Sequence, residues 1–228
     1  MNATPVKRKL AAILATDAVG YSRMMAADEE GTMKVLSAHR SVIDGIIEFH
    51  EGRIINTAGD SVLAEFVSPT QAVRCAVEIQ DALKTRNDSL PEAKRMLFRI
   101  GVNLGDVMVK GDDLLGDGVN VAARLEGIAD PGGICVSSSV YDQIAGKLDL
   151  GFVNIGAQNL KNIQRPIQVY RVERGGAQVV PAAPQDGRMD SGTDGKLPRG
   201  HCPGLGLRTA APAQVRRAQV RRAGEDRR

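Results

Sequence analysis

The stretch Leu10-Ala-Ala-Ile-Leu-Ala-Thr-Asp17 is a short apolar run that ends in an aspartate. Such a run, bounded by polar residues, is typical of a buried strand. A second stretch, Arg53-Ile-Ile-Asn-Thr-Ala-Gly-Asp-Ser-Val-Leu-Ala-Glu-Phe66, predicts a hairpin whose turn, Ala58-Gly-Asp-Ser61, contains Asp60. Each of the two strand-like segments therefore delivers one aspartate to a strand end.

Two carboxylates at strand ends suggest a divalent metal site. Mg²⁺ that serves phosphate chemistry usually binds one or two carboxylates together with substrate oxygens, and such ions hold a triphosphate during in-line displacement. Asp60 taken alone is better explained by turn geometry, which Asp and Gly both favour. Gly20 and Tyr21 follow Asp17 closely and can offer backbone N–H groups to phosphates, so the context favours the metal interpretation.

Strands and helices alternate along the rest of the body. The apolar patterns predict strands over 97–109, 134–136, 150–155 and 167–172, and helices over 28–50, 69–86, 118–128 and 137–145. This alternation predicts an α/β or α+β domain with one sheet covered by helices. We expect structural or surface roles for His39 and His50, which belong to the first of these helices.

Composition excludes several classes of function. The formal net charge of +3 is uneven, because residues 176–228 carry ten Lys/Arg and five Asp/Glu whereas the rest carries 20 and 22. The body is therefore nearly neutral, which disfavours nucleic-acid binding. Cys75, Cys135 and Cys202 lack CxxC spacing and indicate reduced thiols. No run is long enough to span a membrane, so we expect a cytoplasmic protein; the sequence points to no particular regulatory partner.

The chain divides into three parts by composition. Residues 1–7 are expected to be a flexible N-terminus and residues 8–174 a single domain. Residues 175–228 are rich in Gly, Pro, Ala and Arg, and Ala213-Gln-Val-Arg-Arg is repeated from Ala218. Such a composition cannot bury enough apolar surface to fold, so this part is predicted to be a disordered basic tail. It is either inert, the product of a shifted reading frame, or a contact to acidic lipid or nucleic acid.

A third polar block surrounds the helix predicted over 118–128. Val121, Leu125 and Ile128 fall on one face, which we expect to be buried, and Asn120 and Arg124, four residues apart, share a different stripe. A solvated surface pair is the simpler explanation. However, the pair follows a glycine-rich loop, and arginine is well suited to phosphate binding.

These segments together resemble the catalytic domain of class III adenylate/guanylate cyclases, in its bacterial form. The resemblance covers about residues 8–173 and rests on Ile13-Leu-Ala-Thr-Asp-Ala-Val-Gly-Tyr21, Gly59-Asp60, Arg99-Ile-Gly-Val-Asn-Leu-Gly105 and Gly118-Val-Asn-Val-Ala-Ala-Arg-Leu-Glu126. It implies an α+β, ferredoxin-like cyclase fold with a mainly antiparallel sheet covered by helices. The implied activity is conversion of ATP to cyclic AMP and pyrophosphate.

The resemblance also implies roles for single residues. Asp17, Asp60 and the carbonyl of Ala18 would hold two Mg²⁺ or Mn²⁺ ions. Catalytic roles fall on two residues of the third block, since Arg124 would stabilise charge at the α-phosphate and Asn120 would orient the ribose. The remaining implied positions bind substrate: Gly20, Tyr21 and Lys161 the phosphates, and Asn56 and Asp113 the base.

One position departs from the family pattern. Asn56 occupies the place where adenylate cyclases usually have a lysine that reads adenine. An Asn amide can still donate a hydrogen bond to adenine N1, so ATP remains the expected substrate. The alternatives are a guanylate cyclase, or a module that binds nucleotide or dimerises without turnover; a diguanylate cyclase is disfavoured because its Gly-Gly-Asp/Glu-Glu-Phe signature is missing. In the family the site forms between subunits, so we expect a homodimer.

Overall fold

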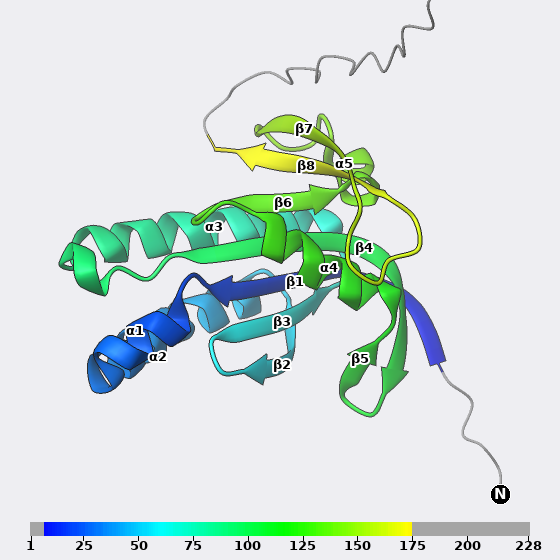
Figure 1. Ribbon diagram of the computed structural model, residues 1–228. Helices are drawn as coiled ribbons and strands as arrows, with labels where there is room; N and C mark the ends of the chain where they lie inside the picture. The colour runs from blue at the N-terminus through cyan, green and yellow to red at the C-terminus, as the bar shows by residue number, and fades with distance from the viewer. Residues whose placement is uncertain (1–6, 175–228) are drawn as a thin grey trace, which may run out of the picture. The chain divides into compact units, whose positions relative to one another are not determined.

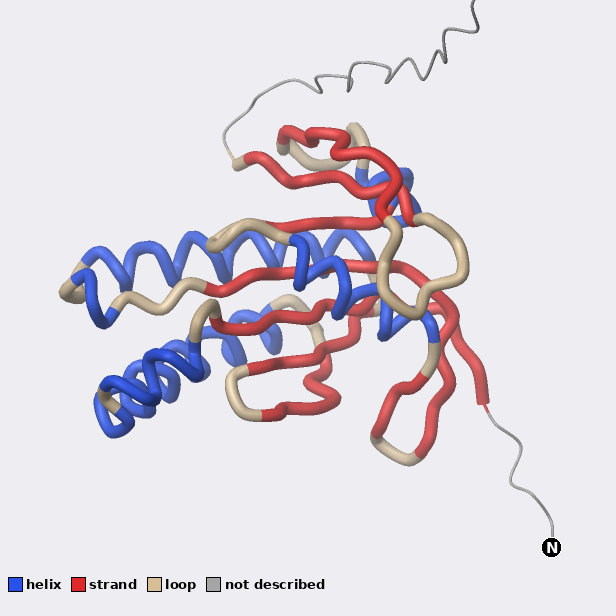
Figure 2. Tube along the Cα trace, viewed as in Figure 1, coloured by secondary structure: helices blue, strands red, loops and turns tan. Residues whose placement is uncertain are grey.

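The computed structural model describes residues 7–174; the predicted tail over 175–228 lies outside these residues. Eight strands form one sheet in the order β2-β3-β1-β4-β6-β8-β7, and β5 pairs with β4 (Figures 1 and 2). All neighbouring strands are antiparallel except β4 and β6. The strands are β1 Lys7–Ala18, β2 Arg53–Ala58, β3 Ser61–Phe66, β4 Phe98–Lys110, β5 Asp113–Leu115, β6 Ile134–Ser137, β7 Gly151–Gln158 and β8 Ile167–Glu173.

Helices cover both faces of this sheet, which confirms the predicted α+β class. One face packs against α2, α3 and α5 through the main hydrophobic core, and α4 packs on the other face, over β1 and β4 (Figure 1). The helices are α1 Tyr21–Ala27, α2 Glu29–Phe49, α3 Pro69–Asp88, α4 Asp117–Ile128 and α5 Ser138–Ile144, with a 3₁₀ turn η1 at Glu92–Lys94.

The sequence explains where the two long helices begin. The Asp28 side chain accepts a hydrogen bond of 2.9 Å from the Gly31 N–H and so caps α2. Ser68 accepts one of 3.4 Å from the Gln71 N–H at the start of α3, where Pro69 occupies the first turn. These caps fix the residues at which the two helices begin.

Gly101 in β4 lets α4 lie directly against the sheet. A Cβ atom at this position would lie 2.2 Å from the Glu126 backbone nitrogen and 2.3 Å from the Ala122 carbonyl oxygen. Both atoms belong to the backbone of α4, so no side chain could move away to relieve the contact. The position of α4, which carries the predicted catalytic residues, therefore depends on the absence of a side chain at residue 101.

Several local predictions need correction. Strand β1 includes Asp17 and continues to Ala18, because both residues pair with β4, so the strand runs one residue beyond the aspartate predicted to end it. Ile128, predicted to be buried, is 39% exposed because it ends α4. Helix α1 and strand β5 are elements that the apolar pattern did not predict. His39 is buried, and its Nδ1 lies 2.9 Å from the Val35 carbonyl oxygen, in keeping with a structural role.

Candidate active site

The Asp17 carboxylate lies at the end of β1, held on two sides. Side chains alternate along a strand, and the alternation places Asp17 on the same face as Ala11, Ile13 and Ala15, the face that carries α4. The Ser61 hydroxyl donates to Asp17 Oδ1 at 3.3 Å. Arg99, which is directly opposite Asp17 in β4, donates to Oδ2 at 3.4 Å. The carboxylate is 28% exposed and therefore remains accessible to a ligand.

Asp60 lies beside Asp17, in the turn between β2 and β3. Gly59 before it has a φ of 60°, which glycine adopts without strain. Arg40 of α2 donates to the Ser61 carbonyl oxygen at 3.3 Å and so ties the turn to the helix layer. Burial raises the pKa of Asp60, and the neighbouring Asp17 carboxyl raises this pKa further. The structure therefore brings together the two predicted metal carboxylates.

Two further charged residues complete this cluster, and neither was given a role from the sequence. Arg99 Nη2 lies 3.0 Å from Glu126 Oε1 of α4 as well as 3.4 Å from Asp17. Burial raises the pKa of Glu126 to about 7; the charges of Asp17 and Asp60 add to this effect and Arg99 opposes it. The site thus contains three carboxylates, and two of them, Asp17 and Glu126, pair with the same guanidinium.

The donors of this cluster fit a hard divalent cation. Asp17 and Asp60 supply carboxylate oxygens from adjacent strand ends, and Ala18 supplies a carbonyl at the same place; Mg²⁺ and Mn²⁺ favour such oxygen ligands. Two acidic groups in contact also repel each other unless a proton or a cation lies between them. Across residues 7–174 no group of three or more His, Cys, Asp or Glu is arranged as a complete metal site, so any remaining ligands would come from substrate or water.

The turn after Asp17 has the features predicted for phosphate binding. Gly20 adopts a left-handed conformation with a φ of 70° and precedes α1, which begins at Tyr21. No side chain caps this helix, and the first N–H groups of a helix have no partner within it. Backbone N–H groups at the start of α1 are therefore available as donors a few residues after Asp17.

The other predicted residues group around α4 and the loop between β7 and β8. Asn120 and Arg124 are both exposed, as predicted. The Nε atom of Arg124 donates to the carbonyl oxygen of Lys161 at 3.3 Å. The structure therefore brings Arg124 and Lys161 together, although 37 residues separate them in sequence.

The two predicted base-reading residues lie on neighbouring hairpins. Asn56 is exposed in β2, next to a register shift in its pairing with β3. Asp113 is exposed in β5 and pairs with Lys110 of β4. The Arg53 side chain of β2 donates to the Asp112 carbonyl oxygen at 3.4 Å, which holds the β2–β3 and β4–β5 hairpins side by side (Figure 1).

The carboxylate cluster at Asp17 and the Arg124–Lys161 pair lie on different sides of α4. Glu126 faces Asp17 through Arg99, and the Arg99 Nη1 atom also donates to the Gly127 carbonyl oxygen at 3.3 Å. Residues two apart in an α-helix are rotated by about 200°, so Arg124 points away from Glu126 and toward Lys161. Within one chain, Arg124 is therefore turned away from the Asp17 carboxylate.

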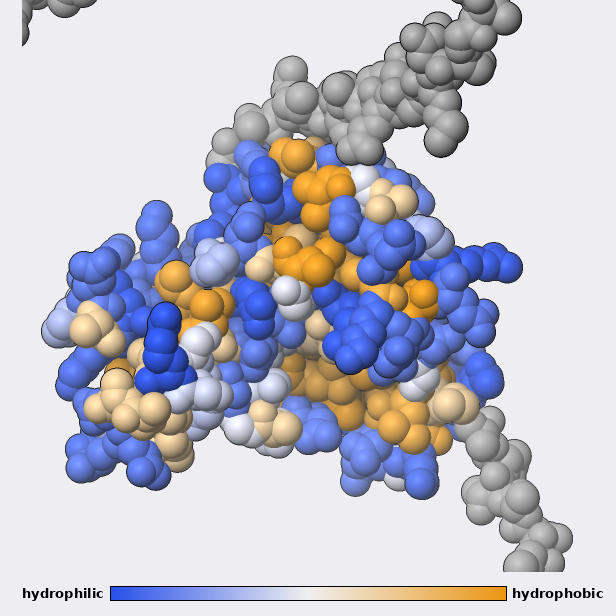
Figure 3. Space-filling model, in the orientation of Figure 1, coloured by the Kyte–Doolittle hydropathy of each residue, from blue (hydrophilic) through white to orange (hydrophobic). Residues whose placement is uncertain are grey.

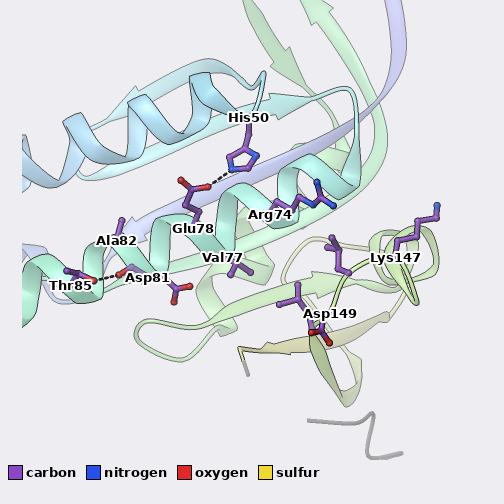
Figure 4. A pocket seen from close by; sticks show the side chains of 11 residues that line it. His50, Arg74, Val77, Glu78, Asp81, Ala82, Thr85, Lys147 and Asp149 are labelled. Carbon is purple, nitrogen blue, oxygen red and sulfur yellow. Dashed lines mark hydrogen bonds and ion pairs between the residues drawn. The ribbon is translucent and has the colours of Figure 1, made fainter. Parts of the chain in front are cut away.

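A hollow of about 670 Å³ lies elsewhere, between α3 and the chain that follows α5. His50, whose Nε2 lies 2.8 Å from Glu78, lines it together with Arg74, Lys147 and Asp149 (Figure 4). It contains none of the predicted site residues. The charge cluster at Asp17, rather than the size of a cavity, thus locates the candidate site.

Comparison with known proteins defines the class. Residues 6–174 match the model of the adenylate and guanylate cyclase catalytic domain. A Rhizobium meliloti protein named "Putative adenylate cyclase 3" is 47% identical over 166 residues, which are 72% of this chain and 28% of that protein. The solved structure of an adenylate/guanylate cyclase/hydrolase from Silicibacter pomeroyi is 41% identical, with a TM-score of 0.70, and the match covers 75% of this chain and all of that one.

The chain belongs to the class III adenylate and guanylate cyclase catalytic domain family. The adenylyl cyclase CyaB of P. aeruginosa, at 22% identity and a TM-score of 0.67 over 75% of this chain and 97% of that one, shares the fold. The chain spans 28% of the Rhizobium relative and 21% of a Myxococcus xanthus serine/threonine-protein kinase, pkn2, to which it is 28% identical over 76% of its length. In the part that the structure describes, no helix is long and apolar enough to cross a membrane.

Proposed function

We propose that the chain is an adenylate cyclase that converts ATP to 3′,5′-cyclic AMP and pyrophosphate, and that it does so as a homodimer. The 3′-oxygen of the ribose attacks the α-phosphorus, a new O–P bond forms, the bond to pyrophosphate breaks, and the hydroxyl proton is released. The observation that carries this proposal is that one chain brings Asp17, at the end of β1, beside the turn that holds Asp60, where the neighbouring Ser61 hydroxyl donates to Asp17 Oδ1 at 3.3 Å.

In this proposal Asp17, Asp60 and the Ala18 carbonyl hold two Mg²⁺ or Mn²⁺ ions. When bound, the ions lower the pKa of the 3′-hydroxyl and neutralise phosphate charge. The protein itself holds both carboxylates close together. Ser61 and Arg99 donate to Asp17, and Arg40 donates to the Ser61 carbonyl oxygen next to Asp60. The backbone donors at Gly20 and Tyr21 then face the phosphates.

The residues on α4 and its neighbours bind the rest of the substrate. Arg124 stabilises the charge that develops at the α-phosphate, where one well-placed donor contributes about 3 kcal/mol. Asn120 orients the ribose and Lys161 contacts the polyphosphate. Asn56 and Asp113, on the two adjacent hairpins, read adenine, with the carboxylate of Asp113 accepting from the exocyclic amine.

The direction of Arg124 supports a site shared between two chains. Arg124 lies on the side of α4 away from Asp17 of its own chain, so a second copy is needed to bring it to the phosphates. A two-fold symmetric dimer would supply this group twice and form two equivalent sites.

The face that carries α4 offers an apolar surface for such a dimer. Ile55, Leu63, Val109 and Val119 are only partly buried on this face, and apolar side chains gather beside the β2–β3 and β4–β5 hairpins in Figure 3. The opposite face is covered by α2, α3 and α5. A second copy placed against the α4 face would cover this surface.

One observation favours a rival function. Asn56 replaces the cationic residue that adenylate cyclases usually have, and without it a nucleotide could bind and not be turned over. The chain would then be a nucleotide-binding or dimerising module. The presence of Asp17, Asp60, Asn120 and Arg124 together argues for turnover, because binding alone does not require all four.

The test is a product assay followed by a complementation experiment. The purified protein is incubated with ATP or GTP and Mn²⁺ or Mg²⁺, with Asp60→Ala as the inactive control, and the products are separated by chromatography. Cyclic AMP is expected from the parent protein; cyclic GMP from GTP instead would assign a guanylate cyclase, and no cyclic product would favour the binding module.

Complementation then tests the shared site. Asp17→Ala and Arg124→Ala chains are each inactive alone, but a heterodimer of the two retains one intact site. A random mixture should recover about one quarter of the parent activity, because half the dimers are mixed and each has one of two sites. No recovery in verified heterodimers would show that the two groups do not act across the interface.

A further inference from the structure

Arg99 makes two hydrogen bonds and one further ion pair at the edge of the proposed metal site. Its guanidinium lies 3.4 Å from Asp17 Oδ2, 3.0 Å from Glu126 Oε1 and 3.3 Å from the Gly127 carbonyl oxygen. Asp17 is in β1, and Glu126 and Gly127 are in the last turn of α4. Arg99 therefore ties the strand that carries a metal ligand to the helix that carries the catalytic arginine.

Glu126 is placed to act on Asp17 through this arginine. Both carboxylates lie close to the same Nη2 atom, so their nearest oxygens are within about 6.4 Å of each other. The Glu126 side chain is only 13% exposed, and the backbone of residue 126 lies directly on Gly101. Its position is therefore fixed by packing, whereas Asp17 and Arg99 are each more than a quarter exposed.

We propose that Glu126 is a positioning residue of the metal site: it anchors the Arg99 guanidinium so that this cationic group does not occupy the place of the metal ion beside Asp17. This inference rests on the proposed function, because it needs Asp17 to be a metal ligand. Without Glu126 the guanidinium would have Asp17 as its remaining carboxylate partner among these contacts. A free cationic group would then compete with the metal for the same oxygens.

The inference predicts a coupling between two substitutions. Mn²⁺ affinity is measured by titration calorimetry or electron paramagnetic resonance on nucleotide-free protein at about pH 8, above the pKa of Glu126. Glu126→Gln should weaken Mn²⁺ binding about tenfold, the scale of one unit charge acting over a few ångströms at a partly buried site. Arg99→Gln should not weaken it, and adding Glu126→Gln to Arg99→Gln should change the affinity by less than about twofold.

A matched control is present in the chain. Glu173 forms a similar pair with Arg171, at 3.2 Å, on β8, so Glu173→Gln should leave Mn²⁺ affinity unchanged. Unfolding midpoints of all variants report on structure separately from binding. Should Glu126→Gln fail to fold, Glu126→Asp keeps the charge but withdraws it from Arg99, and it should weaken Mn²⁺ binding in the parent background only.

The outcomes distinguish this inference from the proposed function. If the parent protein binds no Mn²⁺, or binds it equally well with Asp60→Ala, the metal site itself is wrong. If the parent binds Mn²⁺ and Glu126→Gln has the same effect with and without Arg99, Glu126 does not act through the arginine and the inference fails. The inference is supported if Glu126→Gln weakens Mn²⁺ binding about tenfold only in protein that keeps Arg99.

Discussion

Replacing Gly101 by alanine should destabilise the domain strongly, although it adds only one methyl group. The added methyl would meet the Glu126 nitrogen at 2.2 Å, the Ala122 oxygen at 2.3 Å and the Leu125 carbonyl carbon at 2.9 Å, and all three are backbone atoms of α4. Overpacking a core costs about 1–3 kcal/mol where side chains can adjust. Here only α4 itself can move, so we expect a loss of about 3 kcal/mol in the free energy of unfolding, or about 6–12 °C in Tm.

The control is the same substitution at an open position. Gly45 lies in α2, and a Cβ there would meet nothing within 4 Å. Gly45→Ala should stabilise the protein by about 0.5–1 kcal/mol because alanine favours helix. Urea unfolding at one protein concentration, with equal m values, measures both variants. A Gly101→Ala midpoint within about 0.5 kcal/mol of the parent would refute the close seating of α4 on β4.

Three further outcomes are expected. Asp60→Asn should abolish Mn²⁺ binding and cyclic AMP formation yet raise the unfolding midpoint of metal-free protein at neutral pH, since the raised pKa of Asp60 means that its charge is unfavourable in the fold; an unchanged or lower midpoint would contradict this. Asn56→Lys should raise kcat/KM for ATP about tenfold, because a hydrogen bond from a charged donor contributes about 1–1.5 kcal/mol more than one from a neutral donor, and it should leave Mn²⁺ affinity unchanged. Burial lowers the pKa of His39, so stability should fall as pH drops below about 6.5, and this slope should be smaller in His39→Gln.

The sequence predicts those features that depend on local pattern. The Asp17 and Asp60 segments, the β2–β3 hairpin and helices α2, α3 and α4 follow from apolar periodicity and caps, and the structure contains all of them. Helix α1 has seven residues and none of them is buried, and β5 has three, so neither element is long enough to show a period. Ile128 is exposed because it is the last residue of α4, and periodicity alone does not show where a helix stops packing against its neighbours.

The roles of Arg99 and Glu126 could not be predicted for a different reason. Arg99 reaches Asp17 across a separation of 82 residues, and only the β1–β4 register makes them direct neighbours. Glu126 joins them only because α4 lies close to β4 at Gly101. A one-residue shift in register would turn Arg99 to the other face of the sheet. Charged residues of this kind are visible in the sequence, but their partners are set by the fold.

In the proposed dimer, helix α4 contributes to both active sites. Its last turn contacts Arg99 beside Asp17 of the same chain, while Arg124 and Asn120, on another side, would serve the carboxylates of the second chain. A displacement of one α4 would therefore disturb the metal-binding carboxylates of one site and the position of Arg124 in the other site. A substitution at Asp17 would disturb one site only. In heterodimers with one altered chain, Gly101→Ala should accordingly reduce activity below the half that Asp17→Ala leaves, and equal activities would argue against a shared site.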